Sequence, residues 1–190
     1  QWTGVRLRDV LERIGVKDDA VYLAYHSRDQ HLSGASKKEA ISRGIPISKA
    51  MMDETLLAYK MNQEDIPLIH GQPLRLVVGG WPASASGKWL AQLSIRNMVH
   101  DGAKMGGQAY RIPCETVAPG TPVSDKDMCI IESMPVKSLL TYPKSGALLE
   151  NQKNLEIRGH AWAGELAVSA VYYSIDFGAT WDVCHLSAPI

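Results

Sequence analysis

Residues 70–81 read HGQPLRLVVGGW and residues 86–90 read SGKWL, and this stretch guides the interpretation of the whole chain. The apolar run from Leu74 to Val78 predicts a strand with His70 and Arg75 at its start and a small-residue turn behind it. On their own spacing, His70 and Arg75 more often have structural roles. Lys88 and the glycine turn favour anion recognition instead, because arginine offers phosphate a rigid fork and lysine a point charge. The stretch therefore predicts a site for an anionic ligand rich in oxygen atoms.

Outward from this stretch, periodic patterns predict a domain that mixes helices and strands. Apolar residues at helical spacing predict a helix over residues 6–14, which Gly15 ends. A strand end at residues 45–47 is expected to turn into a short helix with Ser48 as its N-cap. Further runs predict strands over residues 20–25, 56–61, 74–78 and 90–95.

The second half of the chain has a different pattern. Periodicity is lost over residues 98–127, and a loop of this length usually connects domains or has a function. Short strands are then predicted over residues 136–140, 155–157, 161–162 and 167–174, followed by a turn at residues 176–181 and a last strand. Such a series is typical of a β-sandwich, although about 60 residues are too few for a complete one. We therefore expect an α+β chain, with one domain over residues 1–131 and a β-sandwich over residues 132–190.

Composition excludes several classes of partner. The 20 basic and 20 acidic residues balance, so we expect no nucleic acid and no membrane as partner, and any anion site must be local. No apolar run is long enough to span a membrane. The first residue is Gln rather than Met, so we expect a fragment or a processed form. The three cysteines contain no C-x-x-C pair, which favours unreactive thiols, with a Cys114–Cys129 bridge as the alternative.

Three short motifs invite other interpretations. The SGK of residues 86–88 is not a nucleotide P-loop, because Pro82 replaces the required glycine and Trp89 the magnesium-binding Ser or Thr. The DFG of residues 176–178 has no kinase catalytic loop or phosphate loop upstream, and a hairpin turn explains it. His26 and His31 could bind a metal together with the aspartate between them, but a solvated loop is the favoured interpretation.

Five ordered motifs carry a resemblance to a known family: WTGVRLRDVL at residues 2–11, IPISKA at 45–50, LAYKMN at 57–62, HGQPLR at 70–75 and KWL at 88–90. The chain resembles the molybdenum-cofactor domain of the sulfite oxidase family. GHAWAG at residues 159–164 and SIDFGATW at 174–181 are similar to its immunoglobulin-like dimerisation domain. The resemblance implies the C-terminal part of a mixed molybdopterin-binding domain over residues 1–131. It implies the N-terminal part of the dimerisation β-sandwich over residues 132–190.

The family's site residues carry over by position. The resemblance implies that six residues hold the pterin and its phosphate: Asp29, His70, Arg75, Ser86, Gly87 and Lys88. Tyr110 matches the tyrosine beside the molybdenum, and its phenol would hydrogen-bond to the substrate or to an equatorial oxygen on the metal. The alternative for Tyr110 is a loop aromatic packed on the sheet. Arg111 would add positive charge near a small anion.

The same resemblance implies a function. The cofactor would be molybdopterin, the substrate a small sulfur oxyanion such as sulfite, or sulfane sulfur, and the electron acceptor a c-type cytochrome. KMGGQAYRIP at residues 104–113 is most similar to bacterial sulfite or sulfane dehydrogenases. That similarity implies a periplasmic protein that forms a homodimer, or a heterodimer with a cytochrome subunit.

One departure from the family keeps alternatives open. The family's molybdenum-ligating cysteine lies upstream of the W-x-G helix, and none of the three cysteines here matches it. No metal ligand is therefore assigned. One alternative is a non-catalytic fragment that binds pterin or dimerises, and another is a nitrate or sulfoxide reductase of the same family.

Overall fold

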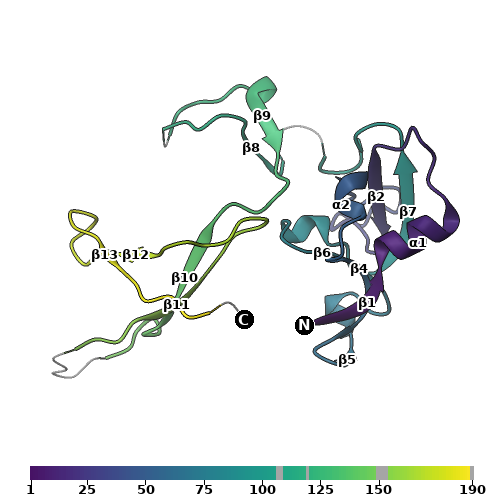
Figure 1. Ribbon diagram of the computed structural model, residues 1–190. Helices are drawn as coiled ribbons and strands as arrows, with labels where there is room; N and C mark the ends of the chain where they lie inside the picture. Colours follow the sequence, from purple (N-terminus) through teal and green to yellow (C-terminus); the bar gives the residue numbers. More distant parts are fainter. Residues whose placement is uncertain (106–108, 119, 149–153, 189–190) are drawn as a thin grey trace. The chain divides into compact units, whose positions relative to one another are not determined.

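The computed structural model describes residues 1–105, 109–118, 120–148 and 154–188. The chain divides into two compact units, Gln1–Glu132 and Ser133–Ile190 (Figure 1). Residues 106–108 of the KMGGQAYRIP motif lie outside the described part of the chain. Among the described residues, no helix is both long and apolar enough to cross a membrane.

The first unit contains a four-stranded antiparallel sheet, whose strands are β1 (Trp2–Arg6), β4 (Thr55–Met61), β5 (Glu64–Asp65) and β6 (Arg75–Val78). Its order is β1–β4–β5, and β6 also pairs with β4. Ala58 in β4 lies opposite both Gly4 and Arg75. A Cβ at Gly4 would lie 2.7 Å from the Ala58 Cα, so glycine is needed for this close approach. The register places Arg75 at the first position of β6, where the predicted anion site begins.

The second sheet of this unit has the order β3–β2–β7 and is also antiparallel. Its strands are β3 (Gly44–Pro46), β2 (Tyr22–Ser27) and β7 (Leu90–Arg96). The middle strand, β2, starts with four consecutive buried residues, which explains why its sequence is apolar rather than alternating.

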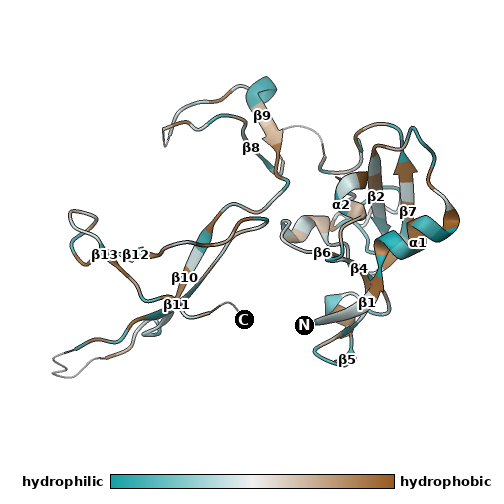
Figure 2. Cartoon of the chain, in the orientation of Figure 1, coloured by the Kyte–Doolittle hydropathy of each residue, from teal (hydrophilic) through white to brown (hydrophobic). Residues whose placement is uncertain are grey.

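Helix α1 (Leu7–Ile14) ends where predicted and begins one residue later, because Arg6 has an extended backbone and is the N-cap. It ends where Gly15 adopts a φ of +77° and donates its N–H to the Leu11 carbonyl. Hydrophilic residues cover most of the visible face of α1, whereas Leu7 and Leu11 are buried in the core (Figure 2). Each fully buried leucine contributes about 1.5–3 kcal/mol to folding. The other large members of the core cluster are Leu23, Tyr25, Ile45, Leu76, Val78 and Trp81.

The short helix α2 (Ile47–Ala50) begins two residues earlier than an N-cap at Ser48 implies, so Ser48 as N-cap is wrong. Pro46 is the N-cap residue, with a φ of −56° and no side-chain cap hydrogen bond. Beyond the helix, the Thr55 hydroxyl donates to the Lys49 carbonyl at 2.8 Å. The described part of this unit also contains three 3-10 helices: η1 (Leu68–His70), η2 (Ala83–Ala85) and η3 (Asp125–Asp127).

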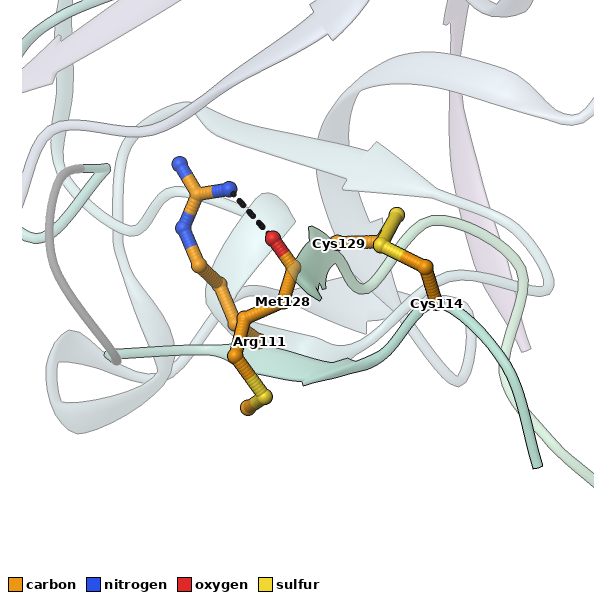
Figure 3. The surroundings of a disulfide bond; sticks show 4 residues. All are labelled: Arg111, Cys114, Met128 and Cys129. Carbon is orange, nitrogen blue, oxygen red and sulfur yellow. Dashed lines mark hydrogen bonds between the residues drawn. A yellow bond between two sulfur atoms is a disulfide. The ribbon is translucent and has the colours of Figure 1, made fainter. Parts of the chain in front are cut away.

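A disulfide closes the hairpin of β8 (Arg111–Pro113) and β9 (Met128–Ile130). The two strands are antiparallel, with Ile112 opposite Cys129, so Cys114 and Cys129 come within 5.0 Å between their Cα atoms (Figure 3). The favoured interpretation of these two cysteines as unreactive thiols is therefore wrong. Cys184 is a free thiol.

The second unit contains two small antiparallel sheets. One pairs β10 (Lys137–Tyr142) with β11 (Arg158–Trp162), and the other pairs β12 (Tyr172–Tyr173) with β13 (Asp182–Val183). Residues 155–157 and most of residues 167–174 are not strand, contrary to expectation. Within residues 167–174 only Tyr172 and Tyr173 are paired, with the two residues of β13. The turn at residues 176–181 is confirmed: the Asp176 carboxylate accepts hydrogen bonds from the Thr180 N–H and hydroxyl.

Candidate active site

Three side chains donate to the carbonyls of η1. The Arg75 guanidinium donates to the His70 carbonyl at 3.0 Å, and the Lys88 ammonium donates to the Ile69 carbonyl at 3.1 Å. The Trp89 indole N–H donates to the Leu68 carbonyl at 2.8 Å. His70 therefore lies in a 3-10 turn ahead of the strand rather than at its start, and its side chain is exposed. The structure brings the predicted His70, Arg75 and Lys88 together around this turn.

Arg75 keeps hydrogen-bonding capacity that the protein does not use. Its Nε is buried and has no partner, and its guanidinium lies 5.0 Å from the centre of the Trp2 ring. Burial lowers the pKa of Arg75, while Tyr25 partly offsets this effect. Among the described residues, no carboxylate lies within ion-pairing distance of Arg75. An anionic ligand would supply the missing acceptor.

Ser86 and Gly87 shape the backbone beside this turn. The Ser86 hydroxyl accepts the Val78 N–H at 3.0 Å, and the Gly87 carbonyl accepts the Leu76 N–H at 2.9 Å, so both residues fix the position of β6. A Cβ at Gly87 would overlap the ring of Tyr25. Only glycine therefore lets this loop pass over the buried tyrosine.

A cavity of about 570 Å³ opens next to η1. Its lining residues are Arg28, Asp29, Leu68, Gln72, Pro73, Trp89 and Leu90. This volume lies in the range of small-molecule and cofactor sites. The predicted Asp29 contributes a carboxylate acceptor to the wall, and the Arg28 N–H donates to the Trp89 carbonyl at 3.1 Å, which joins the two sides.

Tyr110 lies against a buried arginine that the sequence reasoning missed. The Arg43 guanidinium is 4.8 Å from the centre of the Tyr110 ring, and Arg43 is only 1% exposed. Arg43 also donates to the Ser84 hydroxyl at 2.7 Å. Burial lowers the pKa of Arg43, and the nearby Tyr22 and Tyr25 partly offset this. The one sequence signal for Arg43 was a charged residue directly before the apolar run of residues 44–47.

Arg111 is held by backbone carbonyls at the start of β8. It donates to the Met105 carbonyl at 2.9 Å and to the Met128 carbonyl at 3.2 Å, the second of which is drawn in Figure 3. Its Nε is buried without a partner. The predicted Tyr110 and Arg111 therefore share a cationic region with Arg43.

The alternative metal site in the β2 loop has other contacts. His26 Nδ1 lies 2.6 Å from Glu39 Oε1, and His31 Nδ1 lies 2.9 Å from the Ser33 hydroxyl. No group of three or more metal-ligating side chains occurs among the residues that the structure describes.

Comparison with known proteins assigns the chain to a family. The family described as oxidoreductase molybdopterin binding domain matches residues 1–104, and that described as Mo-co oxidoreductase dimerisation domain matches residues 128–189. This chain belongs to the sulfite oxidase family of molybdopterin oxidoreductases. The expected family, α+β fold class and molybdopterin cofactor are thereby confirmed.

Individual family members give the extent of the similarity. The chain is 32% identical to the mitochondrial sulfite oxidase of Homo sapiens, over 98% of this chain and 34% of that protein. It is 27% identical to a nitrate reductase of Hordeum vulgare, over 99% of this chain and 22% of that protein. The crystal structure of the sulfane dehydrogenase SoxCD from Paracoccus pantotrophus matches with a TM-score of 0.75 and 28% identity, over 99% of this chain and 44% of that chain. The chain thus spans about a third of the length of the sulfite oxidases it matches.

The residues on the first unit fit the family's cofactor. The unpartnered Nε of Arg75 and the ammonium of Lys88 suit the phosphate, and the cavity beside them is large enough for a pterin. Asp29 in the cavity wall suits the ring N–H donors of a pterin. The region therefore has basic side chains for the phosphate at one end and a carboxylate acceptor for the pterin ring at the other.

Proposed function

We propose that the complete protein containing this chain oxidises a small sulfur oxyanion such as sulfite, or sulfane sulfur, with molybdopterin as cofactor. The observation that carries the proposal is Tyr110, whose ring packs on the buried Arg43 guanidinium beside Arg111 in a domain of the sulfite oxidase family. The names of the sulfite oxidases and of the sulfane dehydrogenase SoxCD support sulfur as the oxidised element.

The cofactor, when bound, supplies the two-electron oxidation. This chain's residues bind and orient: Arg75 and Lys88 hold the phosphate, and Asp29 accepts from the pterin ring. Gly87 keeps the loop clear of Tyr25, so that these donors remain in place.

Tyr110 and Arg111 act on the substrate. The Tyr110 phenol donates a hydrogen bond to a substrate oxygen, and the positive charge of Arg111 and Arg43 favours an anion over a neutral molecule. A hydrogen bond to a charged group contributes about 1.5–3 kcal/mol. Sulfite gains an oxygen atom from water to give sulfate, two protons and two electrons, and two molecules of a one-electron acceptor take up the electrons.

The acceptor and the compartment are part of the same proposal. We infer a c-type cytochrome as acceptor and a homodimer, or a heterodimer with the cytochrome subunit, as the assembly. The matched dimerisation domain and the SoxCD complex support this inference. The Cys114–Cys129 disulfide supports an oxidising compartment such as the periplasm.

Metal analysis and one activity assay test the proposal. The complete protein, purified after expression with molybdate, should contain about one molybdenum and one pterin per chain and should reduce a c-type cytochrome when sulfite or a sulfane substrate is added. A protein without molybdenum and pterin would support the non-catalytic alternative and overturn the proposal.

Nitrate reduction is the second candidate, because the nitrate reductase of Hordeum vulgare also matches nearly the whole chain. The loaded protein with a reduced viologen dye should leave nitrate and methionine sulfoxide unchanged if the first proposal holds. Turnover of nitrate with no oxidation of sulfur compounds would assign the second function.

A further inference from the structure

The 3-10 turn η2 comes directly before the loop that fits the cofactor. Pro82, with a φ of −55°, is its N-cap, and the Ser86 N–H donates to the Ala83 carbonyl at 3.0 Å where the turn ends. Ala85 belongs to the buried core cluster, which fixes the turn to the first unit. The loop of residues 86–88 begins at the next position. The position of η2 therefore determines where the cofactor loop starts.

Tyr25 holds this turn from within the core. It is buried, and its hydroxyl donates to the Ser84 carbonyl at 2.7 Å. Its ring lies against Gly87, where a Cβ would overlap it. Burial raises the pKa of Tyr25 most, and the charges of Arg43 and Arg75 oppose this rise. Tyr25 therefore lies within electrostatic reach of one arginine assigned to the substrate and one assigned to the cofactor.

The Ser84 hydroxyl holds the buried guanidinium of Arg43. Arg43 Nη1 donates to Ser84 Oγ at 2.7 Å, and in the part of the chain that the structure describes this guanidinium has no other acceptor. A hydrogen bond from a charged donor is about twice as strong as one between neutral groups. Without the hydroxyl, only the stacking on Tyr110 would orient a side chain with several rotatable bonds.

Tyr110 in turn depends on this guanidinium. Its φ is +54°, a left-handed backbone conformation that is uncommon for tyrosine and persists only where surrounding contacts hold it. Its carbonyl accepts the Ile131 N–H at 3.1 Å, and its ring stacks on Arg43. A series of contacts therefore leads from Ser84 in η2 through Arg43 to Tyr110.

We propose that Ser84 is a positioning residue: its hydroxyl fixes Arg43, and through Arg43 the ring of Tyr110, to the same turn that starts the cofactor loop. The arginine offers only donors, so the hydroxyl serves as the acceptor. Ser84 itself need touch neither the cofactor nor the substrate. The inference rests on the proposed function, because the role of Tyr110 in the reaction belongs to that proposal.

Kinetics of the complete, cofactor-loaded protein test this role. Ser84→Ala should leave the molybdenum and pterin content and the melting temperature near those of the wild type. Its kcat/KM for the sulfur substrate should fall about 10-fold, because one charge-assisted hydrogen bond is lost. Ser84→Thr keeps a hydroxyl and should restore most of kcat/KM. The matched control is Ser94→Ala, at another half-buried serine whose hydroxyl accepts from Gln92 at 3.0 Å, and it should behave like the wild type.

A double-mutant cycle shows whether Ser84 acts through Arg43. Arg43→Lys keeps the positive charge but loses the planar guanidinium that reaches both Ser84 and Tyr110. Ser84→Ala should therefore lower kcat/KM about 10-fold in the wild type and less than about 2-fold in Arg43→Lys. Fully additive losses would overturn the proposal, as would a wild-type kcat/KM in Ser84→Ala.

Crystal structures of the loaded wild type, Ser84→Ala and Ser84→Thr test the geometry without turnover, and they decide the question if Arg43→Lys does not fold. The Arg43 guanidinium should leave the Tyr110 ring in Ser84→Ala and stay on it in Ser84→Thr. A guanidinium still stacked on Tyr110 in Ser84→Ala would overturn the proposal. If Arg43 moves but the loaded wild type oxidises no sulfur compound, the proposed function fails, whereas the placement of Arg43 and Tyr110 by Ser84 stands.

Discussion

At the scale of single residues, the ring and the hydroxyl of Tyr110 do different work. The ring packs on the Arg43 guanidinium, whereas the hydroxyl is the group that contacts the substrate in the proposed function. Tyr110→Phe keeps the ring, so molybdenum and pterin content should stay at the wild-type level. The rate constant kcat for sulfur oxidation should fall between about 10-fold and 100-fold, the equivalent of one hydrogen bond to a charged group.

The matched control is Tyr59→Phe, at a tyrosine of β4 that is 45% exposed. Its kcat should equal that of the wild type. An equal loss of cofactor and activity in Tyr110→Phe would show that Tyr110 is a packing residue, the alternative that the sequence left open.

His100 makes the stability of the first unit depend on pH. It is buried, and its Nε2 forms a hydrogen bond of 2.7 Å with the Ser42 hydroxyl. Its Nδ1 lies 3.0 Å from the Arg96 guanidinium. Burial, then the charges of Arg96 and His26, hold its pKa below the ordinary 6.5. As the pH falls below 6.5, the unfolded chain takes up the proton first, so stability is full above this pH and declines toward the folded-state pKa.

Urea unfolding between pH 7.5 and pH 5 measures this effect. The free energy of unfolding should fall with a slope of at most about 1.4 kcal/mol per pH unit for this one proton. His100→Gln should flatten the slope, while His160→Gln, at an exposed histidine of β11, should leave it unchanged. The same slope in wild type and His100→Gln would assign the proton to another group.

Residues of the candidate site also differ in how well the sequence predicts their role. The grouping of Arg75 with Lys88 followed from their spacing around a glycine turn, and the structure brings both to η1. Arg43 belongs to no motif, and its importance comes from burial and from contacts with residues 41 and 67 positions away, Ser84 and Tyr110. Burial of a lone charge is a property of tertiary packing, which local spacing does not encode.

At the scale of elements, the β8–β9 hairpin carries Tyr110 and Arg111, and the disulfide ties its two strands. The Cys114–Cys129 link spans 15 residues, and a loop of that length gains about 3 kcal/mol from cross-linking in the chain-entropy account. The double variant Cys114→Ser/Cys129→Ser should therefore lose up to about 3 kcal/mol of stability in this hairpin. Hydrogen exchange of the β8 and β9 amides should rise, and the KM for the sulfur substrate should rise with it.

Cys184→Ser removes the free thiol and serves as the control, with no expected change in either measurement. Unchanged exchange in the double variant would mean that backbone pairing alone orders the hairpin.

Elements were predicted well where a pattern is long and poorly where it is short. Helix α1 has four apolar residues at helical spacing and a glycine stop, and its observed bounds differ from the prediction by one residue at the start. The strand β12 has only two residues, too few for alternation to identify its bounds within residues 167–174. The N-cap of α2 was misassigned because Pro46, rather than a capping hydroxyl, sets the start of the helix.

At the scale of the whole chain, the two units differ in what holds them together. The core cluster lies entirely in residues 1–132. Helix α1 and the strands β2 and β6 contribute leucines to it, β2 also contributes a tyrosine, and a tryptophan comes from the turn after β6. In the described part of residues 133–190, no residue is buried, and large apolar side chains are exposed. These exposed side chains include Val136, Leu166, Ile175, Phe177 and Trp181, and the hydrophobic stretches appear brown in Figure 2. The second unit therefore has little apolar burial of its own to offset chain entropy.

This difference predicts that the units behave differently when they are expressed separately. Residues 1–132 should unfold in one cooperative thermal transition, because their buried core is complete enough to form one. Residues 133–190 should show no heat-capacity peak and should bind a hydrophobic dye, because their apolar side chains remain exposed. Differential scanning calorimetry of the two fragments is the measurement, and a sharp peak for residues 133–190 as a monomer would contradict the prediction. A peak that appears only as the fragment associates would instead show that a second copy covers these side chains, as the matched dimerisation domain leads us to expect.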